Sequence, residues 1–79
     1  MQNCKRKKSN ETKLLMGIAY TKIIQQCDRY LVRGWISTDE YHELYHYLYQ
    51  PYEAMGGNGT AKRQMELVKN LPPKPEVTV

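Results

Sequence analysis

The chain of 79 residues is long enough for one small domain and too short for several, and a domain of this size buries a modest fraction of its surface. Its 41% apolar residues include no Phe but seven Tyr and one Trp, so the core has to draw on aromatic side chains that carry polar groups. The entire net formal charge of +4 is accounted for by the run Lys5, Arg6, Lys7 and Lys8, because the rest of the chain holds eight basic and eight acidic residues. This distribution weakens the case for a basic groove in the folded part.

The cysteine content argues against a disulfide-stabilised protein, and the length of the apolar runs argues against a membrane-spanning or secreted one. Two cysteines, Cys4 and Cys27, are too few for a disulfide framework and indicate a reducing, intracellular setting. No apolar run reaches the roughly 18 to 20 residues that a membrane span needs, and no signal-type apolar segment follows the basic N-terminus. We therefore expect a soluble cytosolic protein that does not bind a membrane.

A long first helix is predicted from about Ser9 or Asn10 to Arg33, after a disordered basic tail at residues 1–8. Apolar residues recur in it at steps of three and four: Met16, Tyr20, Ile23, Ile24, Cys27, Tyr30 and Leu31. Gly34 is predicted to end the helix, because glycine adopts the left-handed conformation at little cost.

A second helix is predicted to begin at Ser37, which can form a capping box with Glu40, and Ile36 can pack on Tyr41 as a hydrophobic staple. Its apolar arc contains Tyr41, Leu44, Tyr45, Leu48, Tyr52 and Met55. Pro51 removes a helical hydrogen bond, and because the apolar pattern continues to Met55, we expect a kink there.

The run Gly56–Gly59 ends the second helix, and Thr60 or Asn58 is expected to cap a third helix of about ten residues. Its buried face is predicted to contain Ala61, Met65, Val68 and Leu71. Prolines at 72, 73 and 75 end it, so residues 72–79 are expected to form a disordered Pro-rich tail. The sequence thus predicts an all-α domain over residues 9–71, a helical hairpin with a kinked second arm and a short third helix, with flexible tails.

His42 and His46 match the HExxH pattern, in which two histidines one helical turn apart bind zinc. Glu66 follows His46 at a spacing that resembles the third-ligand glutamate of thermolysin-like metalloproteases. Those enzymes present substrate along a sheet edge, whereas this chain contains no credible strand and no second domain that would form a cleft. We therefore predict no enzymatic activity, no cofactor, no metal and no small-molecule substrate, and keep a zinc-binding protein as a third interpretation.

Nucleic-acid binding is the alternative to protein binding. It would use Lys5, Arg6, Lys7 and Lys8 of the tail, with Lys62, Arg63 and Lys69 of the third helix. The competing interpretation is a solubilising tail and a solvated helix face.

Aromatic residues are the main lead for a protein-contact site, because Tyr and Trp are frequent anchors in interfaces. On a helical wheel Tyr47 projects away from the apolar arc and Tyr49 lies at its margin. The residues expected to contact a protein partner or a second copy are Trp35, Tyr45, Tyr47, Tyr49 and Tyr52. Cys27 is in phase with the core and is expected to be a small buried residue.

The segment GWISTDEYHELYHYLYQPYEAMGGNGTAKRQMELVKNLP resembles small uncharacterised helical proteins of bacteriophages and prophages of Gram-positive bacteria. The shared features are a Tyr-x-x-(hydrophobic)-Gly-Gly-Asn-Gly turn, here Tyr52 to Gly59, and a short helix that closes with Leu71-Pro72. The resemblance covers about half of the chain and brings no catalytic residues. It implies a virion-assembly component or an accessory protein that docks on a host or phage protein, located in the bacterial cytoplasm or on the virion.

Overall fold

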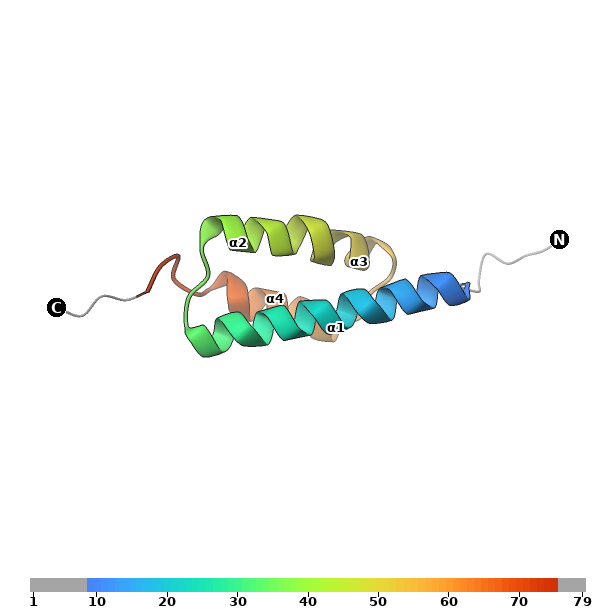
Figure 1. Cartoon of the computed structure of the whole chain (residues 1–79), viewed down its shortest axis with the longest axis horizontal. Helices are drawn as coiled ribbons and strands as arrows, with labels where there is room; N and C mark the ends of the chain where they lie inside the picture. Colours follow the sequence, from blue (N-terminus) through green and yellow to red (C-terminus); the bar gives the residue numbers. More distant parts are fainter. Residues whose placement is uncertain (1–8, 76–79) are drawn as a thin grey trace.

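The computed structural model describes residues 9–75, which form an all-α domain without strands in that range (Figure 1). Helix α1 spans Asn10–Arg33, and a continuous helical segment follows as α2 (Thr38–Glu43), the π-helix η2 (Leu44–Tyr49) and α3 (Gln50–Ala54). Helix α4 spans Gly59–Lys69 and packs against α1. The all-α prediction is confirmed for the described residues. In this range no helix combines the length and apolar character that crossing a membrane requires.

Local capping determines where the helices begin and end. Ser9 caps α1, because its hydroxyl accepts a hydrogen bond from the Thr12 amide at 3.0 Å. At the other end of α1, the Gly34 amide donates to the Tyr30 carbonyl at 2.8 Å. Gly34 itself has a φ of 90°, the left-handed conformation that ends a helix. Ser37 and Glu40 form the capping box of α2. The sequence therefore predicted these ends correctly.

Among the described residues, nine form the buried core: Ile23, Cys27, Ile36, Leu44, Tyr49, Tyr52, Ala61, Met65 and Val68. Cys27 of α1 is fully buried and contacts Met65 of α4, with the two sulfur atoms 3.8 Å apart. Burial raises the pKa of the Cys27 thiol to about 11. Of the face predicted for the third helix, Ala61, Met65 and Val68 are buried and Leu71 is half-buried.

The second helical segment differs from the predicted kinked α-helix. The Gln50 amide bonds to the Tyr45 carbonyl, five residues back, directly before Pro51. A π-helical turn holds more residues than an α-helical one, so side chains beyond Leu44 are rotated from their positions on an α-helical wheel. Tyr49 is consequently buried, whereas Met55 of the predicted apolar arc is 36% exposed. The kink at Pro51 is not confirmed.

Tyr52 explains the glycine-rich turn before α4. Its carbonyl accepts from the Gly57 amide at 3.0 Å, and its hydroxyl accepts from the Asn58 amide at 3.2 Å. A Cβ atom on Gly57 would overlap the Tyr52 ring, while Gly56 has the left-handed φ of 93°. The Asn58 side chain then caps α4 by accepting from the Thr60 amide at 3.0 Å. The turn is therefore built around one buried tyrosine.

The segment after α4 contacts the turn between α1 and α2. The Ile36 amide donates to the Pro72 carbonyl at 3.0 Å, and the Ile36 side chain is buried. Pro72, which the sequence analysis assigns to the C-terminal tail, is thus attached to the domain. Residues 76–79 of that tail and the predicted basic tail at 1–8 lie outside the described residues.

A candidate protein-contact site between α1 and the second helical segment

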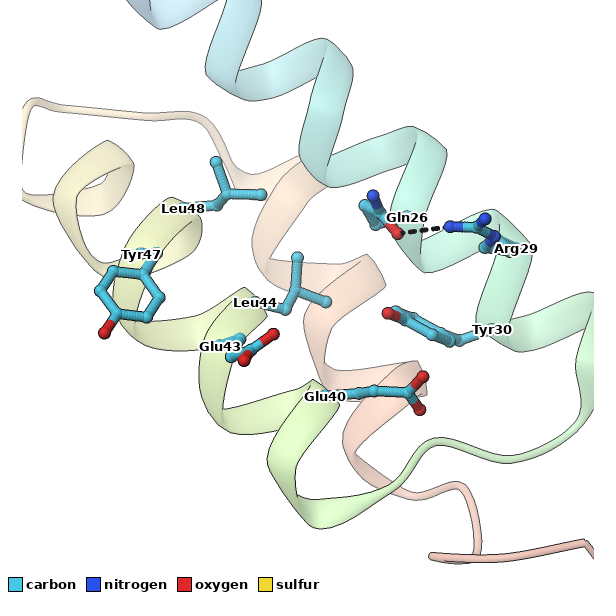
Figure 2. Close-up of a pocket in the computed structure, with 8 residues that line it drawn as sticks. All are labelled: Gln26, Arg29, Tyr30, Glu40, Glu43, Leu44, Tyr47 and Leu48. Atoms are coloured by element: carbon cyan, nitrogen blue, oxygen red, sulfur yellow. Dashed lines mark hydrogen bonds between the residues drawn. The ribbon is translucent and has the colours of Figure 1, made fainter.

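A hollow of about 300 Å³ lies between the C-terminal half of α1 and the segment α2–η2. Its lining residues come from both sides: Gln26, Arg29 and Tyr30 from α1, and Glu40, Glu43, Leu44, Tyr47 and Leu48 from the second segment. Figure 2 shows the two sets on facing helices, with Leu44 and Leu48 pointing toward α1. Because the hollow spans two elements, its shape depends on how these elements pack.

The hollow has an apolar floor and a polar rim. Leu44 is buried at 4% exposure and forms the floor, whereas Tyr47 at the edge is 78% exposed. Arg29 donates to the Gln26 side chain at 3.3 Å, and Glu43 supplies the opposite charge on the other helix. An apolar centre with polar surroundings and an aromatic residue at the edge is typical of protein-contact sites.

Burial, and secondarily the negative charge of Glu40, raises the pKa of Tyr30 above its ordinary value. The Tyr30 hydroxyl can donate a hydrogen bond to a carbonyl or carboxylate placed in the hollow, as any phenol can.

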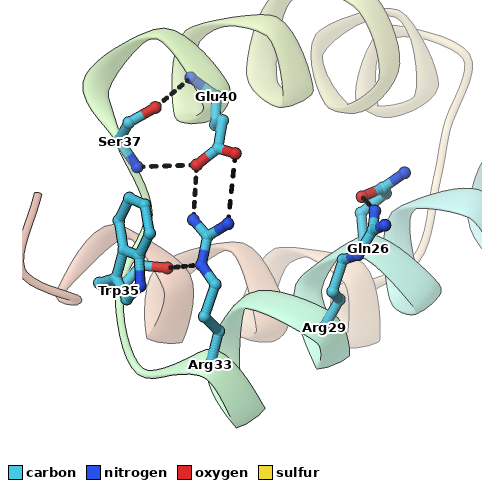
Figure 3. Close-up of polar contacts among 6 residues, drawn as sticks. All are labelled: Gln26, Arg29, Arg33, Trp35, Ser37 and Glu40. Atoms are coloured by element: carbon cyan, nitrogen blue, oxygen red, sulfur yellow. Dashed lines mark hydrogen bonds and ion pairs between the residues drawn. The ribbon is translucent and has the colours of Figure 1, made fainter. Parts of the chain in front are cut away.

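A network at the α1–α2 turn fixes one end of the hollow (Figure 3). The Glu40 carboxylate accepts from both terminal nitrogens of Arg33, at 2.5 and 3.3 Å, and from the Ser37 amide at 3.0 Å. These bonds, with that from Arg33 the largest contribution, lower the pKa of Glu40 to about 2. The Arg33 guanidinium also stacks on the Trp35 ring at 3.6 Å and donates to the Trp35 carbonyl at 3.1 Å.

The structure does not bring the five predicted contact aromatics together. Only Tyr47 is a prominently exposed residue, while Trp35 is half-buried and carries the stacked Arg33. Tyr45 is half-buried on another face of the helix, where it stacks on Tyr41 with ring centroids 6.0 Å apart.

Tyr49 and Tyr52 require a correction to the predicted surface. Each is only 5% exposed and belongs to the core, so neither is available to a partner in this conformation. Tyr49 also donates to Glu53 at 3.3 Å, and burial raises the pKa of this phenol above its ordinary value. The α-helical wheel placed Tyr49 at a margin because it did not include the π-helical rotation.

The histidine pair lies on the exposed surface of the second segment. The His42 and His46 rings are 4.2 Å apart between centroids, and His46 Nδ1 is 3.1 Å from the Gln50 side-chain oxygen. Glu66 lies instead at a second hollow, which Tyr41 and Tyr49 also line. Within residues 9–75 no three His, Cys, Asp or Glu side chains are grouped so that they could hold a metal ion. The zinc interpretation therefore has no third ligand in the described part of the chain.

The basic residues of the nucleic-acid alternative are only partly placed. Lys62, Arg63 and Lys69 are exposed on α4. Lys62 and Lys69 share the second hollow, of about 180 Å³, with the carboxylates of Glu53 and Glu66. Positive and negative groups therefore share this hollow, and α4 alone does not present a uniformly basic surface to a phosphate backbone.

Comparison of the chain with protein-family models, curated proteins and solved structures gave no match. The site is thus defined by its geometry alone. Sequence analysis missed Gln26 and Arg29, because polar residues beside a core stripe look like ordinary solvated positions. Sequence analysis assigned Tyr30 to the core. The Tyr30 ring does pack against the core, but the same residue also lines the hollow. No sequence signal separates these two roles.

Proposed function

We propose that this protein is a non-enzymatic binding module that docks a protein partner over the hollow beside Tyr47. The observation that carries the proposal is the combination of a 78% exposed tyrosine with an adjacent concave surface that has an apolar floor. Because the Tyr47 ring is mostly exposed, its apolar surface adds little to the stability of the fold. That surface is therefore available to be buried against a partner.

The charges of the rim indicate the chemistry of the partner. Arg29 and Glu43 have opposite signs on facing helices, and Tyr30 offers a hydroxyl that can donate a hydrogen bond. A matching segment presents an apolar side chain to Leu44 and Leu48, with polar groups on both sides of it. The resemblance to phage-encoded helical proteins extends this proposal to a virion-assembly component or an accessory protein in a bacterial host.

The test is affinity purification of the tagged chain from expressing or infected bacteria at low and at moderate salt, with mass spectrometry and nucleic-acid staining of the eluate. The decisive variant is Tyr47→Ala, and the matched control is Leu67→Ala, because Leu67 is 48% exposed on α4 and lies outside the hollow. Both changes affect exposed side chains, so circular dichroism should show both variants folded.

A discrete protein that is retained at moderate salt by the wild type and by Leu67→Ala, but lost with Tyr47→Ala, supports the proposal. Equal retention by all three chains refutes the assignment to this hollow. Nucleic acid that elutes as the salt concentration rises supports the alternative based on the basic tail and α4.

A further inference from the structure

The outer face of the first half of α1 carries apolar side chains that the domain does not cover. Leu14, Leu15 and Ile18 are 66%, 60% and 58% exposed. Leu14 and Ile18 line a shallow hollow that also includes Gly17, and Figure 1 shows this end of α1 extending beyond the end of α3. Three large apolar residues exposed within one and a half turns form a patch, which is unlike single exposed residues scattered over a surface.

The residues of this face repeat at alternating spacings of three and four, as in a helix that packs against another helix. Glu11, Leu14, Ile18 and Thr21 follow that pattern, and Lys22 flanks it. Within the repeating positions, acidic Glu11 thus stands at one end of the apolar patch, with Lys13 at its flank, and basic Lys22 stands at the other end.

Gly17 is the second unusual feature of this face. Glycine in a helix interior is unfavourable relative to alanine. A Cβ atom at Gly17 would meet nothing within 4 Å, so no contact among residues 9–75 requires a glycine there. A glycine beside an exposed apolar patch permits the close approach of another helix.

We propose that this face binds the same face of a second copy, with the two α1 helices antiparallel about a two-fold axis level with Met16. In that register Leu14 of each copy lies opposite Ile18 of the other, and the two Gly17 residues lie near the axis. Glu11 of each copy lies beside Lys22 of the other, so both ends of the contact pair opposite charges. A parallel arrangement would instead place Glu11 against Glu11 and Lys22 against Lys22. Repulsion between these like charges disfavours the parallel dimer relative to the antiparallel one.

The contact is small, because it uses a few side chains from each copy. Interfaces at the low end of the size range give weak and concentration-dependent association. We therefore expect a dissociation constant of the dimer of roughly 10⁻⁶ to 10⁻⁴ M. It shares no residue with the hollow beside Tyr47, so self-association and partner docking occupy separate surfaces.

Sedimentation equilibrium of the full chain from micromolar to millimolar concentration tests the proposal. The wild type is expected to move from monomer to dimer mass, and Ile18→Glu is expected to weaken the dimer by roughly tenfold or more. Val32→Glu is the matched control, because Val32 is 81% exposed on α1 outside this patch and should dimerise like the wild type. A wild type that stays monomeric throughout, or equal weakening by both variants, overturns the proposal.

Charge exchange tests the register. Glu11→Lys alone is expected to weaken the dimer, and adding Lys22→Glu is expected to restore it, because each copy then presents the reversed pair. Gly17→Ala should raise the thermal stability of the monomer yet weaken the dimer, since the added methyl group keeps the helices apart. Failure of the double exchange to restore association, or unchanged dimerisation of Gly17→Ala, refutes the antiparallel arrangement.

Discussion

Replacing Gly57 by alanine is expected to destabilise the domain by about 2 kcal/mol, within the range of roughly 1 to 3 kcal/mol found for overpacking. The added Cβ atom would overlap the Tyr52 ring, and Gly57 has no positive φ, so the cost is steric. The ring is 5% exposed and its hydroxyl bonds the Asn58 amide, so displacing it also sacrifices a hydrogen bond of about 1 kcal/mol. Complete expulsion of the ring sets an upper limit of about 3 to 5 kcal/mol.

Thermal and urea denaturation followed by circular dichroism measure this effect. A loss of about 2 kcal/mol corresponds to a fall in Tm of roughly 8 to 16 °C for a domain of this size. Gly59→Ala is the matched control, because a Cβ atom at Gly59, the first residue of α4, meets nothing within 4 Å. It should be neutral or stabilising by up to about 1 kcal/mol, since alanine favours the helix.

A double-mutant cycle with Tyr52→Ala identifies the cause. If the overlap with the ring produces the cost, Gly57→Ala should cost little once the ring is absent. An unchanged Tm for Gly57→Ala, or the same cost with and without the Tyr52 ring, would refute the steric explanation of this turn.

Three further predictions concern the Arg33–Glu40 hydrogen-bond network, the buried Cys27 of the core, and Gly34 in the turn between α1 and α2. The Glu40 pKa is lowered from its ordinary 4.5 to about 2, so its stabilisation is present above pH 4.5 and is lost as pH falls toward 2. The pKa shift corresponds to about 3 kcal/mol of stability before solvent screening. Because the Glu40 side chain is one third exposed, we expect Glu40→Gln to cost about 1 kcal/mol. The variant should also lose less stability than the wild type between pH 4.5 and 2 in acid denaturation. In a Cys4→Ser background, Cys27 should react with a thiol reagent at pH 8 only as fast as the domain unfolds; rapid labelling of native protein would contradict its burial. Gly34→Ala should cost about 1 to 2 kcal/mol in urea unfolding, because φ of 90° is unfavourable for alanine, and no change would contradict the left-handed cap.

Local sequence signals account for the helix boundaries in this protein. The Ser37–Glu40 capping box and the Gly34 stop depend on residues within one turn of each other, so their hydrogen bonds can be inferred without the fold. The same holds for Asn58 as one of the two expected caps of α4.

The candidate site was less predictable. Tyr47 was correctly placed on the exposed side, whereas Tyr49 was assigned to a surface from which it is absent. The difference arises at η2, where hydrogen bonds to the fifth preceding residue rotate the following side chains. Hydrophobic periodicity assumes one helical repeat and contains no signal for this change.

The sequence by itself determined that the chain is helical, where the helices are capped, and that its net formal charge of +4 comes from the run Lys5–Lys8. Only the tertiary structure decided which aromatic residues are buried, because burial depends on the π-helical rotation and on the packing of α4 against α1. It also decided that the apolar face of α1 around Ile18 has no covering element among the described helices, since that requires the positions of all its neighbours. Caps are contacts between residues close in sequence, whereas burial is a property of the assembled chain.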